Sequence, residues 1–438
     1  MRRPVVALAP PSIIIDLNCF NAQNRGGNNG YEWINHSLDP KPVVEHEPRI
    51  RFGGPDCSRP YEASPLNISA MSFGALSRNA ILALNKGAKI GGFFHNTGEG
   101  GISPYHLEYG ADLVWQIGTG YFGCRDSKGR FDEALFADKA CLDQVKVIEI
   151  KLSQGAKPGH GGILPAVKLT PEIAAIRHVP MGQDVISPPA HTAFSSPLGL
   201  LEFVARLRDL AGGKPVGFKL CIGRKSEFLA ICKAMLETGI TPDFITVDGS
   251  EGGTGAAPIE LTNSVGTPLR DGLIFVRNAL VGIGLRDQVR LIAAGKAISA
   301  FHVLRLIALG ADTVNSARAM MFALGCIQSR HCNRGTCPTG VATQDPARYK
   351  ALHVDDKASR VARYHRSLFK NLMEMVGAAG LASLEELEPH HINRRVQGTE
   401  TRNYAELYPC VADECLLSGV CLPETLRSDW EQAGIDHW

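Results

Sequence analysis

FITVD, residues 244–248, is a short run of β-forming residues that ends in a carboxylate and is followed by the glycine-rich turn GSEGGTG (249–255). The segments VGFKL (216–220), RLIAA (290–294) and TVNS (313–316) have the same character, and each is followed by a turn and a stretch of helical periodicity. Short strands that alternate with helices are typical of βα units, whose strands pair in parallel. These segments therefore predict a parallel sheet covered by helices.

Four earlier segments repeat the pattern, and they are Leu66–Ala70, Gly92–Asn96, Leu113–Ile117 and Val147–Lys151. Eight parallel strands with intervening helices close into a (β/α)8 TIM barrel, an α/β fold. We predict an irregular N-terminal arm at 1–60, the barrel at 61–345, a C-terminal helical extension that caps it at 346–397, and a cysteine-containing tail at 398–438. The long gap between the fourth and fifth strands is rich in glycine and proline, which predicts functional loops.

Composition limits the class of protein. Hydrophobic residues make up 44% of the 438 residues and charged residues 21%, which is typical of a globular protein with a large core. The net charge of +2 gives no broad field for nucleic acid or an anionic membrane. No apolar run reaches the roughly 18–20 residues of a membrane span. Pro10 and Pro11 interrupt the apolar start, so we expect a cytoplasmic protein without a signal peptide.

Polar residues lie at or just after the carboxyl ends of six consecutive predicted strands. They are Ser72, Asn96, Gln116, Lys151, Lys219 and Asp248. Barrel enzymes keep their active sites at this carboxyl face, so the six side chains would surround one opening. Some could be interior polar groups that neighbours satisfy, but a buried unpaired lysine is costly, and the set contains two lysines.

The turns after the last three strands are rich in glycine, which lets backbone N–H groups approach a phosphate. The predicted contacts are Ser250, Gly252, Gly253, Gly295, Ser316, Ala317 and Arg318. The loops after strands seven and eight are the usual phosphate site of this fold. FMN fits such a site, with its ring near Gln116, Lys151 and Lys219, where a lysine would favour the negatively charged reduced ring.

Three cysteines lie close together in the segment 326–338, as Cys326-x5-Cys332-x4-Cys337-Pro338. This spacing favours iron–sulfur ligation. Zinc is the main alternative, although its sites favour C-x2-C pairs and four ligands, and free thiols, including a nucleophile, are a third. A second trio, Cys410, Cys415 and Cys421, reads as incidental cysteines of the tail, with a metal or second cluster as the alternative.

Several segments together resemble the FMN-binding synthase domain of glutamate synthases, and especially stand-alone proteins of the FMN-binding glutamate synthase family. They are NISAMSFGALS (67–77), HNTGEGG (95–101), QIGTGYFG (116–123), IEIKLSQGAKPGHGG (148–162), ISPP (186–189), GFKL (217–220), EGGTGA (251–256) and CIQSRHCNRGTCPTGVATQDP (326–346). The resemblance covers about residues 66–346 in order. The tail that holds Cys410 to Cys421 lies outside it.

The resemblance implies an oxidoreductase in which 2-oxoglutarate and ammonia form 2-iminoglutarate, and reduced FMN gives a hydride to the imine carbon to yield L-glutamate. A 3Fe–4S cluster would pass electrons to FMN. The chain shows no glutaminase or NADPH-binding domain, so ammonia and electrons are expected from elsewhere: free ammonia or a separate glutaminase, and an electron donor protein such as ferredoxin or an NADPH-oxidising subunit.

The resemblance also implies residue roles. Cys326, Cys332 and Cys337 match the cluster ligands. Lys151, Lys157 and Arg177 match positions that hold the substrate carboxylates or lie beside the flavin, and Glu99 matches a carboxylate at the same site. We therefore expect Lys151 and Glu99 to be catalytic, and Lys157 and Arg177 to bind the substrate. Gln116 and Lys219 match flavin contacts, and we expect Met71, Ser72 and Asn96 to contact the cofactor as well. Paired cations suit a dicarboxylate on physical grounds as well.

Three positions depart from the pattern of the family. His160 replaces a glutamate, Tyr121 replaces an arginine, and Ile163 replaces a glutamine that binds substrate. The isoleucine removes a hydrogen bond from the pocket, which puts 2-oxoglutarate in question but not the flavin chemistry. Two alternatives therefore stay open: the same cofactors acting on another imine or oxo acid, and a non-catalytic electron-transfer subunit of a larger complex.

Overall fold

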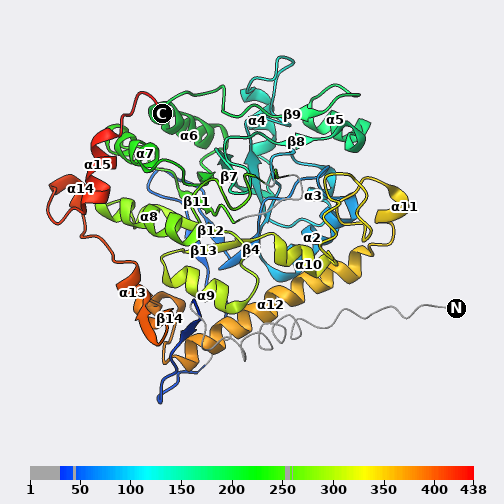
Figure 1. Cartoon of the computed structure of the whole chain (residues 1–438). Coiled ribbons are helices and arrows are strands. Elements are labelled where there is room, and N and C mark those ends of the chain that lie inside the picture. Colours follow the sequence, from blue (N-terminus) through cyan, green and yellow to red (C-terminus); the bar gives the residue numbers. More distant parts are fainter. Residues whose placement is uncertain (1–29, 43–45, 252–256, 259) are drawn as a thin grey trace.

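The computed structural model describes residues 30–42, 46–251, 257–258 and 260–438. Its centre is a closed barrel of parallel strands (Figure 1). The strands are β4 (Leu66–Ile68), β5 (His95–Asn96), β6 (Leu113–Ile117), β7 (Val145–Lys151), β10 (Val216–Leu220), β11 (Phe244–Asp248), β12 (Arg290–Ala294) and β13 (Thr313–Ser316). Pairing of Asn315 in β13 with Asn67 in β4 closes the circle. The predicted (β/α)8 barrel is confirmed.

Three strands differ from their predicted bounds. β4 ends at Ile68 and β7 begins at Val145. The predicted strand Gly92–Asn96 is wrong at its start, because Gly92 is the C-cap of the preceding helix. Its φ of 71° is left-handed, and its N–H donates to the carbonyl of Ala88. Glycine takes this conformation at little cost, so it ends the helix and leaves only His95–Asn96 for the strand.

Helices surround the barrel. They are α2 (Arg78–Gly91), α3 (Pro104–Leu107), α4 (Glu133–Ala140), α6 (Pro197–Leu210), α7 (Lys225–Thr238), α8 (Leu269–Gly282), α9 (Ala300–Ala308) and α10 (Arg318–Leu324). The main core lies between helices and strands, as where Trp115 of β6 stacks on Phe136 of α4 at 5.2 Å. A second cluster closes the amino end of the barrel. There Phe52 of the hairpin β2 (Ile50–Phe52) and β3 (Tyr61–Ala63) stacks on Phe244.

The long insertion between β7 and β10 was predicted to be loops, and it contains short regular elements. They are β8 (Ile163–Leu164), η1 (Ala166–Lys168), α5 (Pro171–Arg177) and β9 (Val185–Ile186). β8 and β9 pair antiparallel, with Ile163 opposite Ile186. Thr170 caps α5 by accepting from the N–H of Ile173, and Pro171 occupies the first turn. The helix places Arg177 at its carboxyl end.

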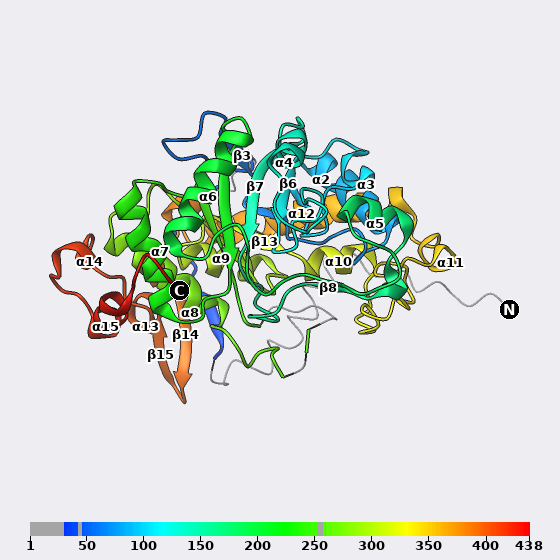
Figure 2. The ribbon, with the colours of Figure 1, turned by 90° about the horizontal axis from the view of Figure 1, so that it is seen from above.

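The C-terminal part covers one side of the barrel. After α11 (Pro346–Tyr349), the long helix α12 (Val354–Ala378) packs along α2, α9 and α10. The turns η2 (Leu384–Glu386) and η3 (Pro389–His391) lead into β14 (Ile392–Gln397), which pairs with β15 (Glu400–Asn403) and with β1 (Glu32–Ile34) of the arm. The helices α13 (Tyr404–Leu407), α14 (Cys415–Ser418) and α15 (Glu424–Gln432) lie on the side of the barrel away from α5 (Figure 2).

The sheet β1-β14-β15 joins segments that the sequence assigned to the arm, the cap and the tail. Glu32 of β1 is the centre of this junction, because its carboxylate pairs with Arg270 and Arg305 and accepts a hydrogen bond of 2.7 Å from Tyr404. The predicted domain bounds stay a prediction. No helix in the described ranges is long and apolar enough to cross a membrane.

Candidate active site at the carboxyl face of the barrel

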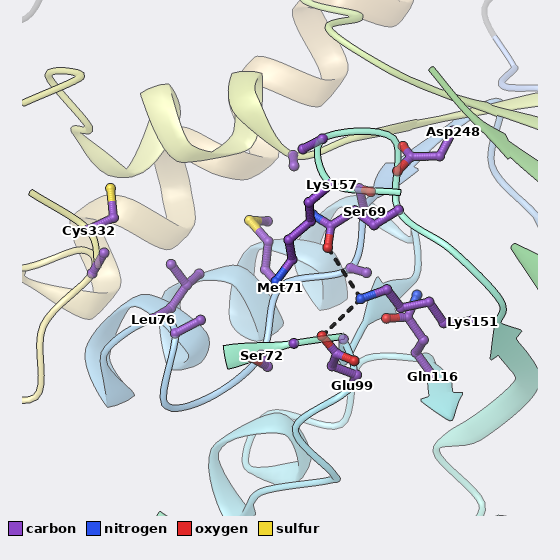
Figure 3. A pocket seen from close by; sticks show the side chains of 18 of the residues that line it. Ser69, Met71, Ser72, Leu76, Glu99, Gln116, Lys151, Lys157, Asp248 and Cys332 are labelled. Carbon is purple, nitrogen blue, oxygen red and sulfur yellow. Dashed lines mark hydrogen bonds and ion pairs between the residues drawn. The ribbon is translucent and has the colours of Figure 1, made fainter. Parts of the chain in front are cut away.

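A cavity of about 270 Å³ opens at the carboxyl ends of the strands (Figure 3). Its walls come from the ends of β6, β7 and β10 to β13, from the loop after β4, from the insertion and from the cysteine loop. Fourteen residues predicted from the sequence line it: Met71, Ser72, Glu99, Gln116, Lys151, Lys157, Ile163, Arg177, Lys219, Asp248, Gly295, Ala317, Arg318 and Cys332. The fold therefore brings most of the predicted site together.

Other predicted residues do not line this cavity. Asn96, Ser250, Ser316, Cys326 and Cys337 are absent from its walls. The Ser316 hydroxyl donates to the carbonyl of Ala297 at 2.6 Å, so it supports the turn. Gly252 and Gly253 lie outside the described residues.

Lys151, at the end of β7, faces Glu99 (Figure 3). Its Nζ donates to Glu99 Oε1 at 2.9 Å and to Gln154 Oε1 at 3.2 Å. Burial would raise the pKa of Glu99, but the charges of Lys151, Lys157 and Arg177 outweigh it and lower that pKa. A Cβ at Gly118 or Gly162 would overlap the Glu99 carboxylate, so these two glycines make the room that it occupies. The carboxylate is thus ionised and held among cations.

Lys157 and Arg177 are the other two cations near Glu99. Lys157 Nζ donates to the carbonyl of Gly161 at 2.9 Å, and burial followed by the charge of Lys151 lowers the pKa of Lys157. Burial also lowers the pKa of Arg177 to about 10. The Arg177 guanidinium donates to the Phe73 carbonyl at 3.2 Å, and its Nε has no hydrogen-bond partner among the described residues. A buried cation with an unused donor is suited to an anionic ligand.

The inside of the barrel below the cavity holds Glu149, which sequence reasoning missed. Its Oε1 accepts from Gln116 Nε2 at 2.7 Å and from Asn96 Nδ2 at 2.8 Å, and its Oε2 accepts from Thr246 at 2.7 Å. Asn96 therefore stabilises the interior of the barrel and does not line the cavity. Strand alternation was the available signal, since Glu149 lies two residues before Lys151 on the same face of β7.

Cations outnumber anions in the cavity wall. Among the described residues that line it, the cations are Lys151, Lys157, Lys168, Arg177, Lys219, Lys296 and Arg318, and the carboxylates are Glu99 and Asp248. Asp248 pairs with Lys219 at 3.4 Å and also accepts from the N–H of Gly155. Sequence reasoning missed Lys168, whereas Lys296 belongs to the turn predicted to bind the phosphate. The excess of positive charge suits ligands that carry several negative charges.

The ends of β12 and β13 could hold a phosphate. Gly295 has a φ of 158°, and a Cβ there would lie 3.1 Å from Leu269 Cδ2, so the turn is tightly packed. Lys296 and Arg318 line the cavity beside it. Asn315 Oδ1 is buried and has no hydrogen-bond partner in the described ranges. The cations and the unpaired amide oxygen are the groups that a phosphorylated polar ligand would use.

The three cysteines of the segment 326–338 have different surroundings. Cys337 is buried, whereas Cys326 and Cys332 are partly buried. Burial raises the pKa of Cys332, and negative charge on Cys326 and Cys337 would raise it further, which places the three thiols near one another. Burial would raise the pKa of Cys337, but hydrogen bonds from Thr339 and from backbone N–H groups lower it. This loop therefore stabilises a thiolate.

No group of three or more His, Cys, Asp or Glu side chains in the described part of the chain is arranged to hold a metal ion. An iron–sulfur cluster differs, because its thiolates bind different iron atoms and need not converge on one point. In the second trio Cys415 is buried beside Gly282, and Cys410 and Cys421 are exposed. The role of this second trio stays a prediction.

The three departures from the family pattern have different places. His160 is exposed and lies outside the cavity wall. Tyr121 is buried, and its hydroxyl accepts from the N–H groups of Thr192 and Ala193 and contacts His191 Nδ1 at 3.0 Å. His191 Nε2 contacts the carbonyl of Lys151 at 2.9 Å, so this network braces the end of β7. Only Ile163 of the three lines the cavity.

A family model described as "Conserved region in glutamate synthase" matches residues 57–382. The chain belongs to the glutamate synthase family. It is 44% identical over 343 residues to the "Glutamate synthase large subunit-like protein YerD" of Bacillus subtilis, a match that covers 78% of this chain and 65% of that protein. It is 35% identical over 358 residues to the "Archaeal glutamate synthase [NADPH]" of Methanocaldococcus jannaschii, which covers 82% and 66%.

This glutamate synthase family member spans just under two thirds of the length of each of these two relatives. The match to the "Glutamate synthase [NADPH] large chain" of Bacillus subtilis, at 32% identity, covers 20% of that protein. Among solved structures, a flavocytochrome b2 variant with pyruvate bound superposes with a TM-score of 0.53 at 12% identity, covering 96% of this chain and 93% of that one. This likeness concerns the fold alone.

Proposed function

We propose that this chain is an FMN- and iron–sulfur-dependent oxidoreductase of glutamate synthase type. It reduces 2-iminoglutarate, formed from 2-oxoglutarate and ammonia, to L-glutamate. Membership of the glutamate synthase family supports the reaction class. The observation that carries the proposal is the cavity wall, in which seven cationic side chains accompany two carboxylates.

The substrate end of the cavity is the part near Glu99. Lys151, Lys157 and Arg177 are the cations whose charges act on that one carboxylate, so the group has an excess of positive charge. A dicarboxylate would balance this excess. Arg177, with its unused Nε donor, and Lys157 bind the carboxylates, because charge-assisted hydrogen bonds are the strong ones. The substrate then lies beside the Lys151–Glu99 pair.

The cofactor end of the cavity fits FMN. Lys296 and Arg318, with the tight turn at Gly295, would hold the phosphate. Gln116 and Lys219 would contact the ring, and the unpaired Asn315 Oδ1 offers a further acceptor. FMN, when bound, supplies the hydride that reduces the imine carbon. The protein's part is to hold the substrate beside it and to exclude water.

Proton transfer is the task of Lys151 and Glu99. Imine formation releases one water from 2-oxoglutarate and ammonia, and reduction takes up a hydride and a proton. Lys151 Nζ holds a proton 2.9 Å from Glu99 Oε1, and Gln154 accepts a second hydrogen bond from the same ammonium. A hydrogen-bonded ammonium and carboxylate can deliver and recover protons at the reacting nitrogen and oxygen.

The cysteine loop fits a cluster of the 3Fe–4S type. Cys326, Cys332 and Cys337 would be the ligands, and the hydrogen bonds that lower the pKa of Cys337 favour the thiolate that iron requires. Cys332 also lines the cavity, so a cluster there would be next to the substrate chamber. A partner protein, a ferredoxin or an NADPH-oxidising subunit, supplies the electrons. Ammonia is free or comes from a separate glutaminase.

A second candidate keeps these cofactors and acts on another imine or oxo acid. Ile163 favours it, because this apolar side chain lines the cavity where the family pattern has a glutamine. A third candidate is a non-catalytic electron-transfer subunit. The cluster of Lys157, Arg177 and Glu99 argues against it, because electron relay requires no site for carboxylates.

The test begins with protein purified without oxygen and assayed for flavin and iron. The protein is reduced with dithionite, freed of excess reductant, and mixed with 2-oxoglutarate plus ammonium. We expect reoxidation of the flavin and formation of L-glutamate, with neither compound sufficient alone. Reoxidation only by other oxo acids would favour the second candidate. No reoxidation by any of them, with both cofactors bound and electrons passing to a protein acceptor, would favour the third.

A further inference from the structure

Lys168 is a buried lysine between the cavity and the cysteine loop. It is the last residue of η1 in the insertion, and its side chain is 4% exposed. It lines the cavity together with Cys332. In the sequence it lies neither at a predicted strand end nor beside a motif glycine.

The ammonium of Lys168 connects two segments that are far apart in the chain. Its Nζ donates to the carbonyl of Ala75 at 2.8 Å and to the carbonyl of Cys332 at 3.1 Å. Ala75 belongs to the loop that carries Ser72, and Cys332 is the middle cysteine of the trio. The side-chain stem reaches Gly335, where a Cβ would lie 3.4 Å from Lys168 Cγ. The lysine thus fixes the cysteine loop against the cavity wall.

Among the described residues, no carboxylate pairs with Lys168. The charged groups that act on it in the described part of the chain are Cys332, Cys337 and Arg177. Both of its hydrogen-bond acceptors are neutral carbonyls. A buried charge is screened less than an exposed one, so its field at the cysteine loop is strong.

We propose that Lys168 is a positioning residue that sets the reduction potential of the redox group held by Cys326, Cys332 and Cys337. The inference rests on the proposed function, because it requires the iron–sulfur cluster. When the cluster accepts one electron its charge becomes more negative by one unit, and a fixed cation nearby stabilises that state. Lys168 therefore raises the potential and eases electron entry beside the substrate chamber.

The test is an equilibrium redox titration of the anaerobically purified holoprotein, followed by the iron–sulfur signal in electron paramagnetic resonance. Lys168→Met keeps the stem and removes the charge, and Lys168→Arg keeps the charge. At the wild-type midpoint we expect the ratio of reduced to oxidised cluster to fall about tenfold in Lys168→Met, about 59 mV for one electron. Lys168→Arg should stay near wild type.

Arg330→Gln is the matched control, because Arg330 is an exposed cation of the same loop, whose charge water screens. It should shift the ratio much less than Lys168→Met. An unchanged potential in Lys168→Met with iron bound would overturn the inference alone, and so would an equal shift in Lys168→Arg, which would indicate a packing effect. Absence of iron from the wild-type protein would overturn both this inference and the cluster in the proposed function.

Discussion

Lys151 Nζ lies 2.9 Å from Glu99 Oε1, and this ion pair joins the end of β7 to the loop after β5 in the wall of the cavity. The two side chains are 10% and 17% exposed, so water weakens their attraction only in part. Arg177 and Lys157 act on the same carboxylate. Glu99 is therefore the anion around which the cations of the substrate end are organised.

Glu99→Gln should separate proton transfer from substrate binding. The amide can still accept from Lys151, but it cannot take up a proton. We expect the rate of flavin reoxidation at saturating 2-oxoglutarate to fall by about 10²-fold or more, which is the usual contribution of general acid–base catalysis. The KM for 2-oxoglutarate should not rise, because one anion has been removed from a site that binds anions. A raised KM with an unchanged maximal rate would assign Glu99 to binding instead.

Arg177→Ala should weaken the binding of any substrate that carries a carboxylate. Loss of a buried charged partner costs about 2–4 kcal/mol, so KM should rise by about 30-fold or more. Arg125→Ala is the control, because both guanidinium groups lie over the Phe122 ring, at 5.0 Å for Arg177 and 5.6 Å for Arg125, but only Arg177 lines the cavity. Equal effects of the two changes on KM would mean that Phe122 packing, and not anion binding, is what matters.

Cys332→Ser should release the iron and leave the flavin. A serine hydroxyl is a poor substitute for a thiolate ligand, whereas the proposed flavin contacts lie elsewhere in the cavity. Iron assay and the flavin absorbance spectrum measure the two losses separately. Cys421→Ser changes an exposed cysteine of the tail and should lose neither. Retention of iron by Cys332→Ser would remove this residue from the ligand set.

His106 should make the protein less stable as the pH falls. Burial lowers its pKa from 6.5 to about 3, and its Nδ1 accepts the N–H of Ser103 in the capping box of α3. Between these values the unfolded chain binds the proton and the folded protein does not, so stability falls as the pH drops below about 6.5. The loss between pH 7 and 5 is about 2 kcal/mol, since each pKa unit is worth about 1.4 kcal/mol.

His106→Gln keeps an acceptor for the capping box but cannot titrate. By scanning calorimetry, the decrease in Tm from pH 7 to 5 should be smaller in this variant than in the wild type. His390→Gln changes an exposed histidine, so its Tm should decrease over this pH range as much as that of the wild type. If His106→Gln lost as much Tm as the wild type over this range, His106 would not be a source of the acid sensitivity.

The strands and most of the charged side chains of the cavity wall could be predicted from the sequence. The polar residues at the carboxyl ends of barrel strands lie at one face, and this rule alone predicted that Gln116, Lys151 and Lys219 lie in the same cavity wall. Contacts between distant segments could not be predicted this way. The contacts of Lys168 with Ala75 and Cys332 depend on how the insertion folds over the barrel. The strand pairing of β1 with β14 likewise joins residues more than three hundred positions apart.

The position of a residue can be predicted correctly from the sequence while its side chain makes other contacts than expected. Asn96 ends its strand as expected, but its amide points to Glu149 inside the barrel. Tyr121 stands where the family pattern has an arginine, and only the structure reveals that its hydroxyl reaches Lys151 through His191. In both cases the position of the residue in the sequence pattern could be predicted, but the direction of its side chain could not.

Ile163 is the departure that bears on the substrate. It belongs to β8, is 50% exposed and lines the cavity beside Gly162. Ile163→Gln would restore the amide of the family pattern without changing the fold of the hairpin. Ile186→Gln is the matched control, since Ile186 pairs with Ile163 across the hairpin, is 66% exposed and does not line the cavity.

If the cavity is built for 2-oxoglutarate, Ile163→Gln should speed reoxidation of the reduced flavin by 2-oxoglutarate plus ammonium. The gain should be about tenfold or less, because one neutral hydrogen bond contributes about 0.5–1.5 kcal/mol. If the cavity serves a less polar oxo acid, the glutamine should slow the reaction with that compound and barely speed the reaction with 2-oxoglutarate. The reason is that the amide of the glutamine would lose its water against an apolar part of that substrate. Ile186→Gln should change neither rate. No turnover of 2-oxoglutarate in either the wild type or Ile163→Gln, with both cofactors bound, would reject glutamate synthesis and leave the second and third candidates, another imine or oxo acid as the substrate or an electron-transfer subunit.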